Sequence, residues 1–180
     1  MALERRHRAS VPWTALADAV LAETARTAVH PTGRWQRAPD DERTDAALLL
    51  PPLYGAVATD DPRTLLTLQS VTGSLVSDGY VYRYQPDARP LGESEGAFQL
   101  CVFALSMAQL QQGDVLAAAR SFERGRGACG STGLFTEEYD VRQRQLRGNL
   151  PQAFVHAIFL EAAAKLGEAA AKLGPAGTRP

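Results

Sequence analysis

The sequence predicts an all-α protein of three stacked helical hairpins, equivalent to half of an (α/α)6 toroid. Apolar residues recur with helical spacing in six segments of the 180-residue chain. Three of these segments are apolar on almost every face, and they alternate with three that carry a charged side. A helix that is apolar all round must be buried all round. The predicted order along the chain is therefore outer, inner, outer, inner, outer, inner.

The first predicted helix covers residues 13–29, and Glu23 and Arg26 give it a charged side that suits an outer position. The second, at about 45–57, contains "AALLLPPLYGAVA" and suits an inner position. Its proline pair at 51–52 should kink or shorten it, because proline removes a backbone donor and clashes with the preceding turn.

The third predicted helix begins at Asp61-Pro62, a favourable N-cap and first-turn pair, and runs to about residue 76. The fourth, at about 95–112, contains "AFQLCVFALSMAQL" and is the most apolar of the six. Between them, "YVYRY" at 80–84 alternates and predicts a short extended piece.

The fifth predicted helix starts at Asp114 and ends near the glycines at 125 and 127. The sixth runs from about 149 to 173 and contains "EAAAK" twice, which predicts a stiff C-terminal extension stabilised by Glu–Lys pairs. We expect residues 1–12 to be flexible, 13–173 to form the half-toroid, and 174–180 to be disordered.

Composition excludes several functions. The net charge is −1 and the pI is about 6.3, so nothing favours nucleic acid or an anionic membrane as a partner. No apolar run reaches membrane-spanning length, and no secretory signal is evident. We expect Cys101 and Cys129 to be a reduced pair in a cytoplasmic protein. No His, Cys or Asp cluster has metal-ligand spacing, so neither a metal nor another cofactor is predicted.

The lengths of the connecting loops also alternate. The loops that lead from an inner helix to an outer helix are short, and those that lead from an outer helix to an inner helix are long. The long connections, at about 30–43, 78–94 and 128–148, should all emerge at one end of the stack, where sites are usually built. They are rich in aromatic, arginine and carboxylate side chains. Rings that cover the faces of a pyranose and polar groups that bind its hydroxyls suit sugar recognition.

Four pieces of these loops carry a resemblance to a known family. "RTDAALLL", "GYVYRY…GESEGAF", "GLFTEEYD" and "GNLPQAFVHA" occur in this order and at suitable separations. Together they resemble the C-terminal part of the glucoamylase, glucodextranase and bacterial trehalase family, glycoside hydrolase family fifteen, over about residues 13–164. The resemblance implies a six-hairpin (α/α) barrel that hydrolyses α-glucosidic bonds with inversion.

An inverting site needs a protonated carboxyl for the leaving oxygen and an ionised carboxylate that activates water. The resemblance places Glu137 at the general-base position. It also places Arg83 where the family holds sugar hydroxyls, and it implies that six further residues bind substrate or line the site: Tyr82, Glu95, Glu138, Tyr139, Gln152 and His156.

One part of the family pattern is missing. The family's general acid lies earlier in the chain, in a Trp-Glu motif, and neither Trp13 nor Trp35 is followed by glutamate. The chain is therefore expected to be incomplete as a hydrolase on its own, and to need a separate N-terminal half or a second copy. The alternatives are a non-catalytic half-barrel that binds a sugar or a protein, and a half-barrel recruited to a different reaction.

Each candidate residue also has an ordinary structural interpretation. Glu137 and Glu138 would lie in a solvated loop, Glu95 would be a first-turn acid, and His156 a hydrogen-bonded structural histidine. Arg83 would pair with Asp78 or Asp87. Asp45 is interpreted as a helix N-terminal acid, with Arg43 reaching the cleft.

Three hairpins also leave two flanks open. The residues expected on these flanks are apolar: Trp13, Leu16 and Leu53 at one end, and Phe154, Ile158 and Phe159 at the other.

Overall fold

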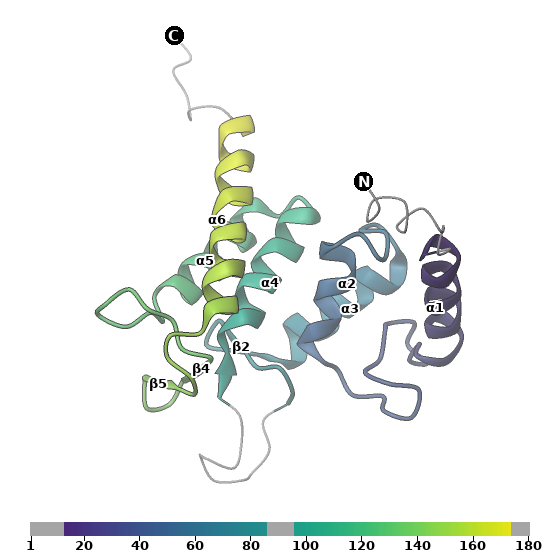
Figure 1. Cartoon of the computed structure of the whole chain (residues 1–180), viewed down its shortest axis with the longest axis horizontal. Coiled ribbons are helices and arrows are strands. Elements are labelled where there is room, and N and C mark those ends of the chain that lie inside the picture. The colour runs from purple at the N-terminus through teal and green to yellow at the C-terminus, as the bar shows by residue number, and fades with distance from the viewer. Residues whose placement is uncertain (1–12, 86–95, 174–180) are drawn as a thin grey trace, which may run out of the picture.

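A computed structural model describes residues 13–85 and 96–173 of the chain. It confirms the helical class and all six predicted helical segments (Figure 1). The helices are α1 (Trp13–Thr27), α2 (Leu50–Leu53), α3 (Pro62–Ser74), α4 (Gln99–Gln111), α5 (Val115–Arg126) and α6 (Ala153–Leu173), and a 3-10 segment, η2 (Ala46–Leu49), leads into α2. The predictions for residues 1–12 and 174–180 fall outside the described ranges. Within those ranges no helix combines the length and apolarity needed to cross a membrane.

Helix α4 is the centre of the inner layer. Every residue from Cys101 to Ala108 is buried, as the apolar sequence predicts. α4 packs against η2 and α2 on one side and α6 on the other, while α5 covers both α4 and α6. Phe103 lies in the middle, with the rings of Phe122, Phe135 and Phe159 at centroid distances of 5.8, 5.5 and 5.4 Å. The described chain therefore forms part of a two-layer α/α toroid.

The second predicted helix is shorter than expected. Asp45 caps η2 by accepting a hydrogen bond from the Ala47 N–H at 2.8 Å, which confirms its interpretation as a helix N-terminal acid. The two prolines occupy the first turn of α2, where a missing N–H costs little, and the helix ends at Leu53. The chain then needs residues 54–61 to reach α3.

Short strands hold the long loops together at one end of the helices, as Figure 1 shows. Strand β1 (Val76–Ser77) pairs with β2 (Tyr80–Val81), which confirms an extended piece within residues 80–84. Strands β3 (Ala97–Phe98), β4 (Glu138–Asp140) and β5 (Gln145–Arg147) form an antiparallel sheet in that order. Because β3 occupies residues 97–98, α4 begins at Gln99 and not at the predicted residue 95.

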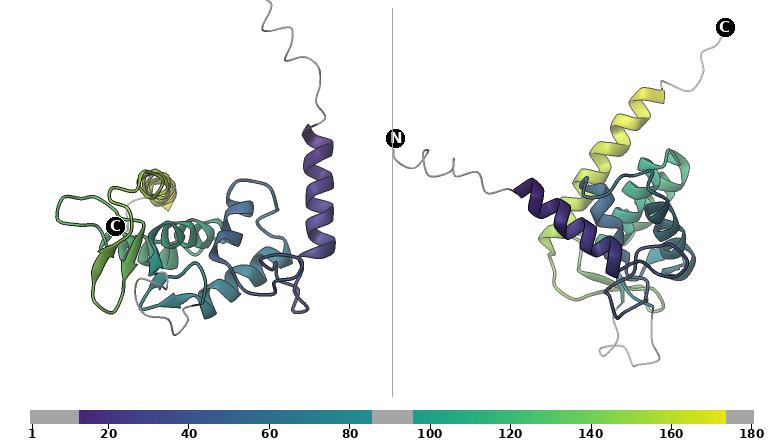
Figure 2. Two further views of the ribbon diagram at one scale, coloured as in Figure 1. Left: turned by 60° about the horizontal axis from the view of Figure 1, so that its bottom comes forward. Right: turned by 90° about the vertical axis from the view of Figure 1, so that its right-hand side faces the viewer.

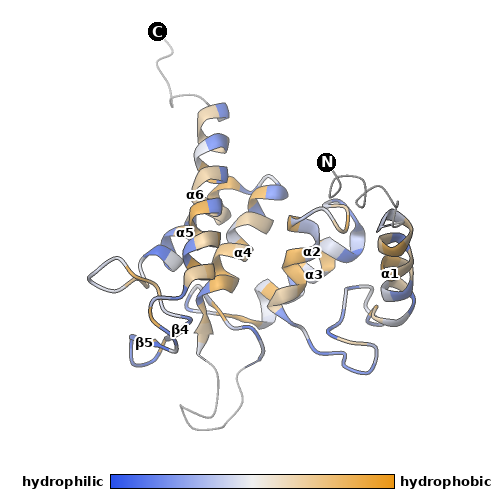
Figure 3. Cartoon of the chain, viewed as in Figure 1, coloured by the Kyte–Doolittle hydropathy of each residue, from blue (hydrophilic) through white to orange (hydrophobic). Residues whose placement is uncertain are grey.

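Helix α1 stands apart from the other helices in Figure 1 and in the left-hand view of Figure 2. It has no buried residue, although much of its ribbon has the orange colour of hydrophobic residues in Figure 3. Trp13 and Leu16 are exposed, as predicted for an open flank. Leu53, predicted on the same flank, is instead buried, because it belongs to the core cluster around α4.

The other flank, on α6, also contains both exposed and buried apolar residues. Phe154 is exposed as predicted. Ile158 is buried, and Phe159 packs on the core with its ring stacked on Phe122 at 5.4 Å. These two residues were wrongly assigned to the open flank, because they lie on the side of α6 that faces α4 and α5.

Candidate functional site

The loop that carries Glu137 is fixed at both ends by backbone hydrogen bonds. The Glu137 N–H donates to the Asn149 carbonyl at 3.1 Å, and the Gln99 N–H at the start of α4 donates to the Glu137 carbonyl at 3.0 Å. The Glu137 carboxylate accepts a hydrogen bond from the Asn149 amide at 2.9 Å and is partly exposed. Among the described residues it has no ion pair within 4.0 Å.

Gly148 allows the chain to pass close to this carboxylate. Its φ of 74° lies in the left-handed region, and an added Cβ would come within 3.0 Å of the Glu137 Cβ and 3.2 Å of its Oε2. A side chain at this position would therefore displace Glu137. Asn149 and Gly148 were not identified individually from the sequence, although both lie in the quoted "GNLPQAFVHA" piece.

Glu138 points elsewhere. Its carboxylate accepts a hydrogen bond from the Gly96 N–H at 2.9 Å, and its backbone lies in β4 opposite Phe98. The two adjacent carboxylates therefore have different partners, so only Glu137 is available beside Asn149. Glu95, also predicted to line the site, lies outside the described residues.

His156 and Gln152 support the loop from the start of α6. The His156 Nε2 accepts a hydrogen bond from the Phe135 N–H at 3.1 Å, which in the neutral ring leaves the proton on Nδ1. The Gln152 N–H donates to the Phe135 carbonyl at 2.9 Å. Next to them, the buried Gln99 amide donates to the Thr136 hydroxyl at 2.8 Å. These contacts connect the loop before Glu137 with both α4 and α6.

Tyr82 and Tyr139 belong to a separate small cluster. They lie opposite Ala97 on neighbouring strands and pack around Tyr80, whose ring stacks on Tyr139 at 4.7 Å. Burial raises the pKa of the Tyr82 hydroxyl, and the Asp140 charge adds to this effect. Burial, followed by contact with Tyr80, raises the pKa of Tyr139. Tyr139 also lines a small polar pocket of about 190 Å³ with Arg124 and Arg144.

Arg83 connects the first two long loops. Its Nε lies 3.6 Å from Oδ1 of the buried Asp45, and its guanidinium lies 4.9 Å from the centre of the Tyr84 ring. Its backbone carbonyl accepts the Ala46 N–H at 3.0 Å. Of the two partners considered for Arg83, Asp78 is wrong, since it pairs with Arg124 at 3.6 Å, and Asp87 lies outside the described residues.

Arg43, which was expected to reach the cleft, forms two hydrogen bonds with the Asp41 carboxylate, at 2.8 and 2.6 Å, and this pair holds the pKa of Asp41 down to about 2. The second guanidinium beside Asp45 belongs to Arg37, whose Nε lies 3.8 Å from Oδ2.

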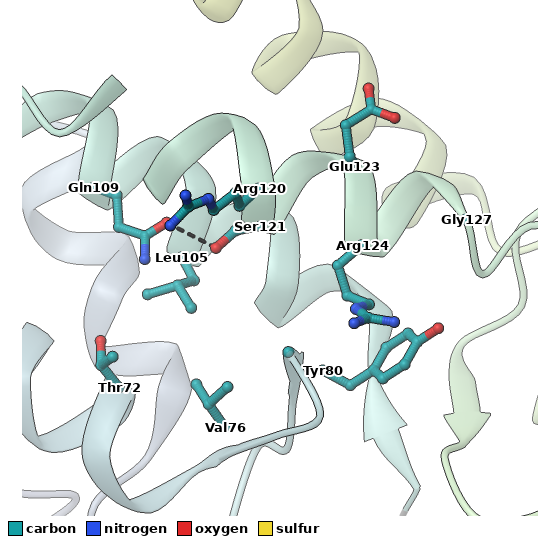
Figure 4. Close-up of a pocket in the computed structure, with 11 residues that line it drawn as sticks. Thr72, Val76, Tyr80, Leu105, Gln109, Arg120, Ser121, Glu123, Arg124 and Gly127 are labelled. Atoms are coloured by element: carbon teal, nitrogen blue, oxygen red, sulfur yellow. Dashed lines mark hydrogen bonds between the residues drawn. The ribbon is translucent and has the colours of Figure 1, made fainter. Parts of the chain in front are cut away.

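A cavity of about 620 Å³ in the described chain contains none of the predicted site residues. It lies on the outer side between α3 and α5, where Arg120, Arg124 and Tyr80 surround it and Ser121 donates to Gln109 at 2.8 Å (Figure 4). No group of three or more His, Cys, Asp and Glu residues in the described parts is placed to hold a metal ion. Cys101 and Cys129 are not joined by a disulfide.

A partial α/α toroid with a carboxylate, an amide and aromatic groups in its clustered loops has the architecture of a glycoside hydrolase. Residues 2–164 match the family model of glycosyl hydrolases family 15, and the chain belongs to this family.

Curated relatives include trehalases. The chain is 35% identical over 152 residues to a trehalase of Mycobacterium tuberculosis, a match that covers 83% of this chain and 22% of the relative. It is 35% identical over 130 residues to trehalase 1 of Sulfolobus acidocaldarius, covering 72% of this chain and 23% of the relative. The chain therefore spans less than a quarter of the length of these proteins.

Solved structures of a glycosidase share the fold. The wild-type glycosidase superimposes with a TM-score of 0.75 at 20% identity, over 88% of this chain and 46% of that one. A variant of a glycosidase in complex with glucose gives the same values. At this identity the match supports the fold alone, and it covers less than half of the solved chain.

Proposed function

We propose that this chain carries the base-bearing half of an inverting site for α-glucosidic bonds, of the glucoamylase or trehalase type, and that it is incomplete as a catalyst on its own. The observation that carries the proposal is the placement of Glu137. Its loop is tied to α4 and to the start of α6, and its carboxylate is oriented by Asn149 and left without a basic partner among the described residues.

Such a carboxylate suits the general base of an inverting hydrolase. The base must hold a water molecule on the far side of the sugar ring from the general acid, with the two carboxyl groups ~6.5–9.5 Å apart. The Asn149 amide fixes one Glu137 oxygen, and the partial exposure of the side chain leaves room for water at the other. The general acid has no candidate in this sequence, so we propose that a separate polypeptide or a second copy completes the site.

The proposed ligand is a glucoside or an oligosaccharide. Arg83 is partly exposed in the loop next to Asp45 and can still reach a hydroxyl, and Gln152 and His156 lie beside the Glu137 loop. We include a cytoplasmic location in the proposal, since the two cysteines are not bonded to each other. No cofactor is required for this chemistry.

A second candidate function is a non-catalytic half-barrel that binds a sugar or a protein partner. The observation that favours it is the packing of Tyr82 and Tyr139 against Tyr80, which uses two predicted sugar-binding rings to hold the loops together.

Hydrolysis assays separate the two candidates. The purified chain alone should hydrolyse trehalose and maltose no faster than buffer, because general-acid assistance contributes ~10²–10⁴ in rate and has no candidate residue here. Addition of the N-terminal part of a family relative, which contains the Trp-Glu motif, should restore turnover. Glu137→Gln should abolish the restored activity, whereas Glu123→Gln, an exposed glutamate of α5, should leave it unchanged.

Turnover by the chain alone that depends on Glu137 would contradict the proposal that it is incomplete. Failure of every complemented mixture to hydrolyse a glucoside, combined with saturable binding of trehalose or maltose, would favour the non-catalytic candidate.

A further inference from the structure

Two buried polar side chains lie next to the backbone of Glu137. Gln99 begins α4 and Thr136 precedes Glu137 in the loop, and each is only 2% exposed. The Gln99 Nε2 donates a hydrogen bond to the Thr136 hydroxyl at 2.8 Å, and this hydroxyl donates in turn to the Glu138 carbonyl at 2.7 Å. Buried polar groups are costly unless they are hydrogen-bonded, so the loss of either side chain would leave the other in an unfavourable state.

The chemistry of the hydroxyl fixes the direction of these hydrogen bonds. A threonine hydroxyl has a single hydrogen to donate. Because that hydrogen goes to the Glu138 carbonyl, the hydroxyl can only accept from Gln99, so the amide must present its nitrogen and not its oxygen. Gln99 Oε1 is therefore turned away from Thr136, and it is buried without a hydrogen-bond partner in the described chain.

This unpaired oxygen makes glutamine an unfavourable residue for stability at the start of α4. An apolar side chain of similar size would avoid the cost of desolvating the oxygen. Departures from the most stable choice of residue are typical of functional sites. The presence of Gln99 is therefore better explained by its contact with Thr136 than by the packing of α4.

The contact between Thr136 and Glu138 encloses Glu137. It joins the side chain of one residue to the carbonyl two positions later, so the ring that it closes includes both backbone dihedrals of Glu137. The Gln99 N–H also donates to the Glu137 carbonyl at 3.0 Å. The first residue of α4 thus contacts both the backbone of Glu137 and the hydroxyl that closes the ring around it.

The backbone dihedrals of Glu137 set the direction in which its side chain leaves the loop. We propose that Gln99 and Thr136 are positioning residues for the proposed general base, and that they hold the Glu137 backbone in the conformation that brings its carboxylate to Asn149. Asn149 acts at a different place, because its amide donates to the carboxylate itself at 2.9 Å. The inference rests on the proposed function of Glu137, but one part of its test needs no substrate.

Four variants separate positioning from stability. Thr136→Val keeps the shape of the side chain but leaves the Gln99 amide unpaired. Thr136→Val combined with Gln99→Leu removes both polar groups, so this double variant should recover the stability that the single variant loses. Thr136→Ser keeps the hydroxyl. The matched control is Ser106→Ala, which removes a fully buried α4 hydroxyl that donates to the Ala118 carbonyl of α5 at 2.7 Å.

Amide hydrogen exchange of the full chain measures the order of the loop without substrate. In Thr136→Val and in the double variant, the Glu137 and Gln99 N–H groups should exchange at least ~10-fold faster than in the wild type, because the ring around Glu137 is open. Thr136→Ser and Ser106→Ala should leave both rates close to the wild-type values. Wild-type rates in Thr136→Val, or equal acceleration by Ser106→Ala, would overturn the proposal.

Kinetics of the mixture with the N-terminal part of a family relative measure the consequence for hydrolysis. Thr136→Val should lower kcat at least ~10-fold with KM little changed, because a displaced base loses transition-state stabilisation and not substrate binding. Thr136→Ser should rescue kcat, and Ser106→Ala should retain it. The double variant should recover stability in urea unfolding but not kcat. Recovery of both would overturn the proposal, because Gln99 and Thr136 would then have a purely structural role.

The two parts of the test also distinguish this inference from the proposed function. A wild-type mixture that does not hydrolyse any glucoside would overturn the proposed function and, with it, the catalytic role of the pair. The exchange rates would still decide whether Gln99 and Thr136 hold the Glu137 loop. A rise in KM with unchanged kcat in Thr136→Val would instead overturn the positioning role and leave the proposed function intact.

Discussion

Helices α1 and α4 are similar in length, with 15 and 13 residues, but they differ completely in burial. α4 has neighbours on every side and buries nine of its residues, whereas α1 buries none although it carries Trp13, Leu16 and Val20. The difference shows that the burial of a helix in this fold depends on the helices beside it as much as on its own sequence. A large apolar side chain stabilises the monomer only where a neighbour covers it.

The largest change in stability that would test this comparison is expected for a substitution in α4. Phe103→Ala should lower the free energy of unfolding by ~3–5 kcal/mol, because it removes a fully buried ring that contacts three others and leaves a cavity. Val20→Ala in α1 should change it by less than ~0.5 kcal/mol, because Val20 is 58% exposed. Urea unfolding followed by circular dichroism measures both. Similar losses for the two variants would show that α1 is packed in solution in a way absent from this structure.

A smaller effect is expected from two helical glycines that differ in their surroundings. Gly125 of α5 touches α4 so closely that an added Cβ would lie 2.6 Å from Val102 Cγ1 and 2.9 Å from Phe103 Cε1. Gly125→Ala should therefore destabilise the chain by ~1–3 kcal/mol through overpacking. Gly167 on the extended part of α6 has no atom within 4 Å of such a Cβ, so Gly167→Ala should be neutral or stabilising by up to ~1 kcal/mol. The same urea unfolding experiment compares them, and a stabilising Gly125→Ala would mean that α4 and α5 are not in close contact.

The sequence predicted which helices are buried in the inner layer better than it predicted which residues are exposed at the two ends of the stack. The all-round apolar pattern of α4 identifies an inner helix because it can be satisfied only by burial, and the structure confirms it. The positions of Leu53, Ile158 and Phe159 were not predictable in the same way. The pattern marks these residues as apolar, but it does not say which side of a terminal helix meets the core.

The candidate site was predictable only in part, and the predicted roles of its residues stay predictions. "GLFTEEYD" located the carboxylates by resemblance, but periodicity could not indicate that Asn149 orients Glu137 or that Gly96 binds Glu138. Both contacts depend on the sheet formed by β3, β4 and β5, whose strands have two or three residues and are too short for an alternating pattern to reveal. The pairing of Arg83 with Asp45 likewise joins two loops that are distant in the sequence.

The smallest change in stability is expected at Asp61, whose contacts with Arg63 lie near the surface of the protein and not in its interior. Asp61 caps α3 through the Arg63 N–H at 2.8 Å, and its carboxylate pairs with the Arg63 guanidinium at 3.0 and 2.7 Å. Hydrogen bonds from Arg63 lower the pKa of Asp61 below its ordinary 3.8. A carboxylate with a lowered folded-state pKa contributes stability that is complete above 3.8 and is lost as the pH falls through the folded-state pKa.

Asp61→Asn isolates this contribution, because asparagine keeps the cap but not the charge. At neutral pH the variant should lose no more than ~1 kcal/mol, since partly exposed ion pairs are weak. Well below 3.8 wild type and variant should unfold at the same urea concentration, because Asp61 is then protonated. A loss at neutral pH as large as that of Phe103→Ala would mean that the start of α3, and not the packing around α4, limits the stability of the fold. A difference that persisted in acid would instead assign the effect to the cap and not to the ion pair.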